Sequence, residues 1–239
     1  MQAQHHNQQD IMTMMNAYNT TLHLLLMLAM IAFAPYSHAD NNAPETAQTL
    51  VVDTSTTLLN AMKARNGEIK QNPSIAYELV EDIVLPHIDF HRISRLVLGK
   101  YWRRANDGQR ARFTNEFKDF LVRTYVTAMI EFSDQIISHA DNVRYLPFRN
   151  DDPEDVTVRM EIKMPDRPPV SVVYRLYLND KAWQIYDLTV EGISLATTYR
   201  SSFASAIRRG GIEKLISQLA NRNKKAAVAS SEDTPTPAL

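Results

Sequence analysis

Residues 186–211 contain a strand and a helix that follow each other closely, each with its own apolar period. Apolar and polar residues alternate along 186–191, which predicts a strand with one buried face; its apolar members are Tyr186, Leu188 and Val190. Gly192 then allows the backbone to turn sharply. Beyond it, apolar residues recur at helical spacing: Ile193, Ala196, Tyr199, Phe203 and Ile207. A strand and a helix that meet at a glycine form a concave apolar corner, which suits an apolar ligand.

Two helices are predicted near the start of the folded part. The first carries an apolar stripe from Leu50 and is expected to stop at Asn66-Gly67, a favourable left-handed cap. The second begins near Pro73-Ser74 and is ended by Pro86.

Two further helices follow, each with a recognisable N-cap. Asp89 caps the third helix, and Gly99 closes it. Asn106, with Gln109 three residues later, opens a long fourth helix that reaches about Ser133. The second half of this helix is apolar nearly all round, so it is either covered by protein on every side or presents one face to a ligand: Val122, Tyr125, Val126, Ala128, Met129, Ile130 and Phe132.

From Val143 the apolar period changes to two. Strands are predicted at 143–148, 156–164, 170–178 and 183–190, with a hairpin turn at Asn179-Asp180. Because helices precede and follow these strands without alternating with them, we predict an α+β fold. About four antiparallel strands would form a meander, with helices packed over one face and an apolar cavity enclosed between the layers. Residues 40–222 would form this single domain, and the polar residues 223–239 a disordered tail.

The first 39 residues have the pattern of an export signal. An apolar run from Leu22 to Ala34 precedes a small-x-small cleavage pattern that ends at Ala39. No Lys or Arg occurs before Lys63, which is unusual for a signal peptide and is explained if translation starts at a later methionine. A membrane anchor is the alternative, but the run is shorter than the ~20 residues needed to span a bilayer. We therefore predict an exported protein.

Composition excludes several classes of function. The 26 basic and 27 acidic residues give a net charge of −1, so the chain lacks the basic field of a nucleic-acid binder. It has no cysteine, which excludes disulfides, thiolate nucleophiles, cysteine-ligated metals and lipidation on cysteine.

Candidate catalytic and metal sites are weak. His87 and His91 have the spacing of a helical metal pair, but the cap at Asp89 places His87 outside the helix, so no metal site is predicted. Asp187, Glu191 and Arg200 would be an acid–base set if they lay near a pocket. Strand alternation instead places both carboxylates on the polar face with Arg200 as an ion-pair partner. We therefore interpret these three residues, with Gly192, as a structural corner, and we predict no catalytic residue.

Basic residues gather between Arg92 and Arg112, with Asp107 as the one acid among them. Together with the aromatic residues in its middle, this segment suits an anionic headgroup, a membrane surface or an acidic partner. An ordinary solvated basic face is the alternative. The residues expected to bind a headgroup or a partner are Arg92, Arg95, Lys100, Trp102, Arg103 and Arg104.

Two segments of the chain carry a family resemblance. The first comprises Ile88-Asp89-Phe90, residues 93–103, Gln109-Arg110, Phe113, Phe117 and residues 121–125. The second comprises Tyr174-Arg175-Leu176, Trp183, Tyr186-Asp187, residues 190–195 and residues 199–203. In this order they resemble the MlaC, or toluene-tolerance, family of periplasmic phospholipid-binding proteins, over roughly residues 45–222.

The resemblance implies a soluble and monomeric periplasmic carrier with phospholipid as cargo and no other cofactor. It would shuttle phospholipid between an outer-membrane lipoprotein complex and an inner-membrane ABC transporter, and so maintain the lipid asymmetry of the outer membrane. Two alternatives remain open. An enzyme, such as an isomerase or a lipid hydrolase, would use the same pocket, whereas an interaction adaptor would have a filled core.

A carrier of this kind needs an enclosed cavity, because exposing two acyl chains to water costs on the order of 20–25 kcal/mol at ~0.8 kcal/mol per methylene. The apolar faces of the fourth helix, the strands and the last helix are the candidates for its walls. The residues expected to line the cavity are Phe117, Leu121, Tyr125, Met129, Val172, Tyr174, Leu176, Leu188, Val190, Ile193 and Phe203.

Overall fold

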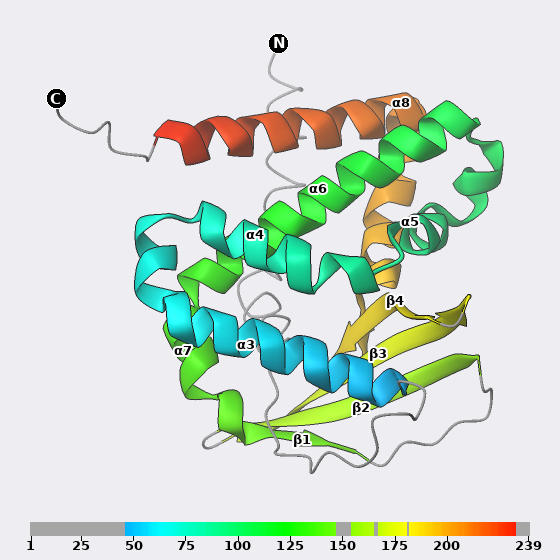
Figure 1. Cartoon of the computed structure of the whole chain (residues 1–239). Coiled ribbons are helices and arrows are strands. Elements are labelled where there is room, and N and C mark those ends of the chain that lie inside the picture. Colours follow the sequence, from blue (N-terminus) through cyan, green and yellow to red (C-terminus); the bar gives the residue numbers. More distant parts are fainter. Residues whose placement is uncertain (1–45, 147–153, 165–166, 181, 233–239) are drawn as a thin grey trace, which may run out of the picture.

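The computed structural model describes residues 46–146, 154–164, 167–180 and 182–232, and its helices lie on one side of an antiparallel sheet (Figure 1). Among the described helices, none is long and apolar enough to cross a membrane. The predicted signal peptide, residues 1–39, lies outside the described residues and stays a prediction. The helical elements are α3 (Ala47–Gln71), α4 (Ser74–Ile83), η1 (Leu85–His87), α5 (Phe90–Leu98), η2 (Gly99–Arg104), α6 (Asp107–Glu131), α7 (Ser133–Ser138), η3 (Ala140–Asn142) and α8 (Leu195–Glu232).

The sheet is a meander in which each strand pairs with the next in antiparallel orientation. Its strands are β1 (Val143–Tyr145), β2 (Asp155–Met164), β3 (Arg167–Asn179), β4 (Ala182–Val190) and β5 (Ile193–Ser194). The α+β class and the meander are therefore confirmed. The fifth strand has only two residues and follows the turn at Glu191 and Gly192, so the predicted strand–glycine–helix corner contains a short strand before α8 begins.

The N-caps of α5 and α6 are confirmed. The Asp89 carboxylate accepts a hydrogen bond from the Arg92 backbone N–H at 2.8 Å, and Gly99 ends α5 with a φ of 52°. Asn106 and Gln109 form a reciprocal capping box, with N–H to side-chain oxygen distances of 2.8 and 3.0 Å. These polar contacts involve residues three apart in the chain, which is why a local pattern predicts them.

The predicted stop of the first helix at Gly67 is wrong. Helix α3 continues to Gln71, and Asn72 is its C-cap. Gly67 does not have a positive φ, and a glycine inside a helix costs only about 1 kcal/mol relative to alanine. Burial of Ile69, which is 1% exposed, offsets that cost because the extra turn places its side chain in the core.

The predicted domain boundary at 222 stays a prediction, and residues 233–239 of the predicted tail lie outside the described residues. Helix α8 is bent at Gly211, where φ is 79° and ψ is 169°, and its second half runs on to Glu232 across α6 (Figure 1). Asn223 is buried there, and its side-chain amide donates to the Glu116 backbone oxygen at 3.0 Å and to the Glu116 carboxylate at 2.8 Å. These bonds join the second half of α8 to α6.

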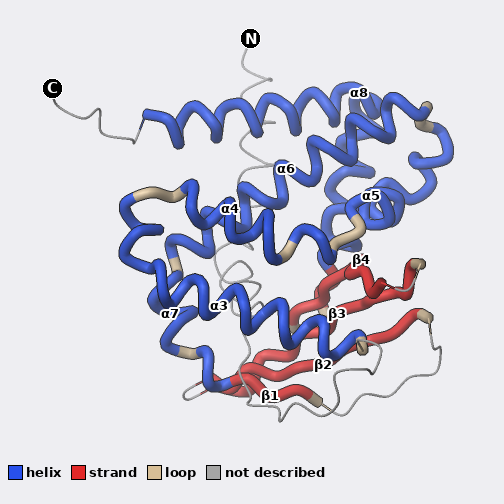
Figure 2. The backbone as a smooth tube through the Cα atoms, in the orientation of Figure 1, coloured by secondary structure: helices blue, strands red, loops and turns tan. Residues whose placement is uncertain are grey.

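The helices cover one face of the sheet (Figure 2), and three clusters of buried side chains hold these elements together. The first joins the sheet to the start of α3, the second joins α5, α6 and α8, and the third joins α3, α4, α6 and α7. Tyr125 packs against all three clusters. The middle of α6 is therefore the point at which the layers of the molecule meet.

Phe117 and Phe203 were predicted to line the cavity, but the structure places both in the second cluster. The Phe117 ring is fully buried and lies 5.4 Å from the Phe203 ring and 5.2 Å from the Tyr199 ring. Neighbouring aromatic rings surround it, so no ligand-sized space remains at its side. Phe117 on α6 and Phe203 on α8 lie on the apolar faces of their helices, and these two faces pack against each other.

Replacing Phe117 with alanine is expected to lower the free energy of unfolding by about 3–5 kcal/mol, because it leaves a void in a fully buried aromatic cluster. Ile193, which is 47% exposed, is the control, and Ile193→Ala should change stability by less than about 0.5 kcal/mol. Urea unfolding followed by circular dichroism measures both. Equal effects of the two changes would contradict this placement of Phe117.

Candidate functional site

A cavity of about 130 Å³ lies between the helical layer and the sheet. Its walls come from α3, α4, η1, α5, α6 and the facing sides of β3 and β4, and nearly all of the lining side chains are apolar. Helices from the start of the domain and strands from its second half thus enclose one apolar space. The lining includes Val51, Leu58, Val80, Val84, Leu85, Ile88, Phe90, Ile93, Val122, Val126, Ile185 and Leu195.

Five of the predicted lining residues lie in the wall of this cavity: Leu121, Tyr125, Met129, Tyr174 and Leu188. The three on α6 are four residues apart and therefore share one face of the helix. Tyr174 and Leu188 are directly paired across β3 and β4, so they project from the same place on the sheet.

The remaining predicted lining residues lie elsewhere. Val172, Leu176 and Val190 have no exposed surface and pack in the sheet cluster that the start of α3 covers. Ile193 is the opposite case, because it is 47% exposed on the short strand β5. Apolar alternation identified the buried face of the sheet correctly, but most of that face contacts helices and only its middle contacts the cavity.

The sequence prediction missed the wall formed by α3, α4, η1 and α5. Val51, Leu58, Val80 and Val84 are apolar positions on helices whose amphipathic faces were recognised. The apolar period shows that such residues are buried, yet it does not separate a side chain that faces a cavity from one that faces another helix.

Asp187 was predicted to lie on the solvated face of the sheet, but it lines the cavity. The pairing of β3 with β4 shifts by one residue, because Arg175 pairs with Asp187 whereas Leu176 pairs with Ile185. Tyr186 is thus an inserted residue, and the bulge interrupts the alternation, so that Ile185, Asp187 and Leu188 all line the cavity. As a result Asp187 is only 6% exposed.

The Asp187 carboxylate accepts three hydrogen bonds. The donors are the Leu188 backbone N–H at 3.0 Å, the Ser194 hydroxyl at 2.8 Å and the Ala196 backbone N–H at 3.1 Å. The last two belong to β5 and to the first turn of α8, where a carboxylate is favoured by the helix dipole. The Asp187 carboxylate therefore links β4 to β5 and to the start of α8 through hydrogen bonds.

The predicted ion pairing within the corner is wrong. Arg200 donates its Nε–H to the Leu96 backbone oxygen at 2.7 Å and thereby ties α8 to α5. Glu191 accepts a hydrogen bond from the Ser171 backbone N–H and has a φ of 49°, followed by Gly192 at 77°. The corner is held by hydrogen bonds to backbone groups, because Asp187 points into the molecule while Arg200 lies on α8 against α5.

Arg92 and Trp102 do not belong to an exposed docking surface. Arg92 pairs with Asp155 at 3.2 Å and stacks on the Tyr177 and Tyr186 rings at 3.9 and 4.4 Å. Trp102 is 8% exposed and meets the His91 ring edge-on at 5.0 Å. Trp102 therefore packs in the cluster of α5, α6 and α8, and Arg92 is held by its contacts with Asp155, Tyr177 and Tyr186.

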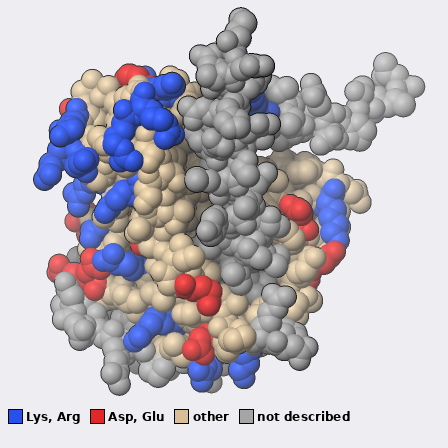
Figure 3. Space-filling view, turned by 180° about the vertical axis from the view of Figure 1, so that it is seen from behind, with Lys and Arg blue, Asp and Glu red and all other residues tan. Residues whose placement is uncertain are grey.

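The other basic residues predicted for docking are exposed: Arg95, Lys100, Arg103 and Arg104. They lie on α5 and η2, beside the first half of α8, which adds the exposed Arg200, Arg208 and Arg209. Figure 3 shows Lys and Arg gathered over the corresponding end of the molecule. We call these seven residues the basic surface.

The phenols in and around the cavity stay neutral. Burial, the first cause in each case, raises the pKa of Tyr125 and of Tyr174 far above the usual range. Burial also raises the pKa of Tyr186 to about 12, assisted by its hydrogen bond to Asp155 at 2.6 Å. Within the described residues no cluster of three metal-binding side chains occurs. The wall is thus an uncharged surface except at the hydrogen-bonded Asp187.

Asp187→Ala is expected to destabilise the protein by about 2–4 kcal/mol, because it leaves two buried backbone N–H groups without an acceptor. Asp187→Asn keeps one side-chain oxygen for those donors and should cost less than about 1.5 kcal/mol. The measurement is urea unfolding at neutral pH. If both variants lost the same stability, the acceptor role assigned to this side chain would be incorrect.

Comparisons with known proteins agree with the predicted resemblance. A family model described as MlaC protein matches residues 52–221. The toluene tolerance protein ttg2D of Pseudomonas putida is 30% identical over 190 residues, which cover 78% of this chain and 86% of that protein. The intermembrane phospholipid transport system binding protein MlaC of Haemophilus influenzae is 22% identical over 165 residues, or 68% and 75% of the two chains.

A solved structure extends the likeness to three dimensions. The phospholipid-binding protein from Ralstonia solanacearum, determined in complex with a phospholipid, is 30% identical and superposes with a TM-score of 0.64. The match covers 77% of this chain and 99% of that one. Because the family model spans well over half of the sequence, this chain belongs to the MlaC family.

Proposed function

We propose that this protein is a periplasmic phospholipid carrier that holds acyl chains in the cavity between its helices and its sheet. The observation that carries the proposal is the cavity's almost wholly apolar and uncharged wall. Such a wall offers acyl chains a favourable transfer from water but offers a polar substrate few hydrogen bonds. The relative from Ralstonia solanacearum, which was solved with a phospholipid, supports the same reading.

Loading requires the walls to separate. The cavity measures about 130 Å³, below the ~300–1,000 Å³ of ordinary ligand pockets. Two acyl chains need more space than this. The helical part of the wall consists of separate helices, so a shift of α3 or α4 away from α6 enlarges the cavity without unfolding an element.

The basic surface is the proposed docking site for the transport partners. Those partners would be an outer-membrane lipoprotein complex and an inner-membrane ABC transporter, between which a monomeric carrier moves phospholipid. Arg95, Lys100, Arg103 and Arg104 are exposed on one side of the molecule. A surface of one sign favours encounters with an acidic partner and accelerates association.

Native mass spectrometry of the purified protein is expected to detect a co-purifying phospholipid, and the protein should take up lipid from vesicles. Leu188→Trp should reduce this load strongly while the fold is retained, because the new side chain occupies the cavity. Val190→Trp is the matched control on the same strand: it has no cavity beside it and should destabilise the fold by about 1–3 kcal/mol through overpacking.

Two outcomes would contradict the carrier proposal. One is the absence of any lipid-sized adduct together with no uptake from vesicles. The other is the release of lysophospholipid or fatty acid at a rate that Asp187→Asn or His91→Ala abolishes while lipid binding remains. The second result would identify an enzyme that uses the same cavity.

The double charge reversal Arg103→Glu, Arg104→Glu is expected to slow association with the inner-membrane complex about tenfold at low salt, with a smaller effect at high salt. Arg159 and Lys163 on the exposed side of β2 supply the control, since their reversal changes the net charge equally but leaves the basic surface intact. Surface plasmon resonance at two ionic strengths measures the rates. Equal slowing by both pairs would exclude a localised docking site.

A further inference from the structure

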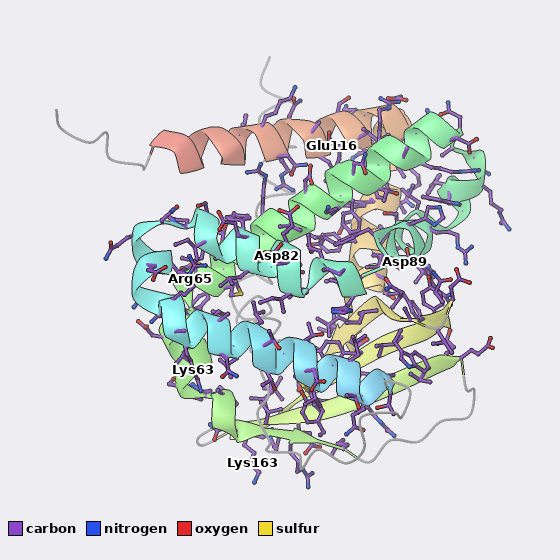
Figure 4. All side chains as sticks on the ribbon, viewed as in Figure 1. Lys63, Arg65, Asp82, Asp89, Glu116 and Lys163 are labelled. Atoms are coloured by element: carbon purple, nitrogen blue, oxygen red, sulfur yellow. The ribbon has the colours of Figure 1, made fainter. Side chains whose placement is uncertain are left out.

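A second hollow, a polar groove of about 520 Å³, lies beside the cavity between α4 and α6. Figure 4 shows side chains on both helices, with Asp82 of α4 and Glu116 of α6 labelled. Leu85 and Val122 line both the groove and the cavity. The apolar space and the polar groove therefore share a wall at these two side chains. On one side of that wall the surroundings suit acyl chains, and on the other side they suit a charged group.

The groove contains charges of both signs. Lys118, Asp119 and Arg123 come from α6 and Glu81 comes from α4. No ion pair links any of these four side chains to another residue in the described part of the chain. Two cations and two carboxylates thus line one groove without neutralising each other by direct contact.

Lys118 connects the groove to the cavity. Its ammonium lies 6.0 Å from the centre of the Phe90 ring, and Phe90 is part of the cavity wall. Lys118 also lies four residues before Val122 on α6, about 6 Å along that helix, and Glu81 lies four residues before Leu85, the first residue of η1. The charged groups therefore begin roughly one turn away from the shared wall.

On the basis of the proposed carrier function, we infer that the groove binds the headgroup of the lipid whose tails fill the cavity, and that it favours a zwitterionic phosphoethanolamine headgroup. Lys118 and Arg123 would bind the phosphate, for which a guanidinium and an ammonium are suited. Glu81 and Asp119 would face the headgroup ammonium. A purely anionic headgroup leaves both carboxylates without a cation, so it binds less well.

The test uses the intact protein and vesicles of equal parts phosphatidylethanolamine and phosphatidylglycerol. After incubation and separation, the lipids bound to the protein are quantified by mass spectrometry. The wild type should hold phosphatidylethanolamine over phosphatidylglycerol by about threefold, as expected for a partly exposed charge contact. Glu81→Gln combined with Asp119→Asn should remove this preference while the total lipid load is maintained.

The cations have a different expected effect. Lys118→Gln combined with Arg123→Gln should lower the load of both lipids about tenfold, because both carry the phosphate. Asp82→Asn with Glu131→Gln is the carboxylate control, on the same two helices but outside the groove. Arg159→Gln with Lys163→Gln, on the exposed side of β2, is the cation control. Neither control should alter the load or the ratio, and circular dichroism verifies the fold of each variant.

Failure of the inference and failure of the carrier proposal are distinguishable. If the wild type takes up no lipid, the carrier proposal itself fails. If it takes up both lipids at the vesicle ratio, or if the groove variants behave like the controls, the headgroup site is overturned while the carrier proposal stands. Titration with sodium phosphate forms a further arm: tight binding that Lys118→Gln removes, with unchanged lipid load, would assign the groove to a free anion.

Discussion

The buried carboxylate of Asp187 joins the sheet to the helical layer, and the shape of the cavity depends on this junction. Its oxygens accept hydrogen bonds from Leu188 on β4, from Ser194 on β5 and from Ala196 in α8. The direction in which α8 leaves the sheet is thereby fixed. Since α8 then packs on α5 and α6, the same contact sets the position of the helices above β4. A carboxylate is retained in an apolar wall because three donors compensate its loss of water.

The bulge that turns Asp187 inward also marks the limit of prediction from the sequence. Alternation along 186–191 assigned Tyr186 to the buried face and Asp187 to the solvated face. Both side chains are buried, because Tyr186 is an inserted residue at a β-bulge. A period-two pattern assumes regular pairing with the neighbouring strand, and one extra residue inverts every assignment on one side of it. The caps at Asp89 and Asn106 were predictable because their partners lie within one helical turn. The extension of α3 past Gly67 was not, because it depends on burial of Ile69 against distant residues.

The same distinction explains which cavity residues were found. Tyr125 and Tyr174, which were selected from the apolar faces of α6 and β3, lie in the cavity wall. Phe117 and Val172 have equally apolar patterns, yet they pack against other side chains. Burial follows from the periodicity of one element, whereas a cavity is a place where several elements fail to meet. The arrangement of α3, α4 and η1 around that place requires the tertiary structure.

For the proposed carrier function, a narrow cavity has an energetic advantage. Full transfer of two acyl chains from water, on the order of 20–25 kcal/mol, reaches the limit of non-covalent affinity at about 18–21 kcal/mol. A protein that bound lipid with that whole free energy would not release it to a partner. A cavity of about 130 Å³ is smaller than two acyl chains, so parting the helices around it to admit a lipid costs part of the transfer free energy. When the lipid leaves, the walls return to this narrower spacing, which leaves little room for water. A contracting apolar cavity therefore lowers the net affinity to a range that permits exchange, while the tails stay shielded from water during transport.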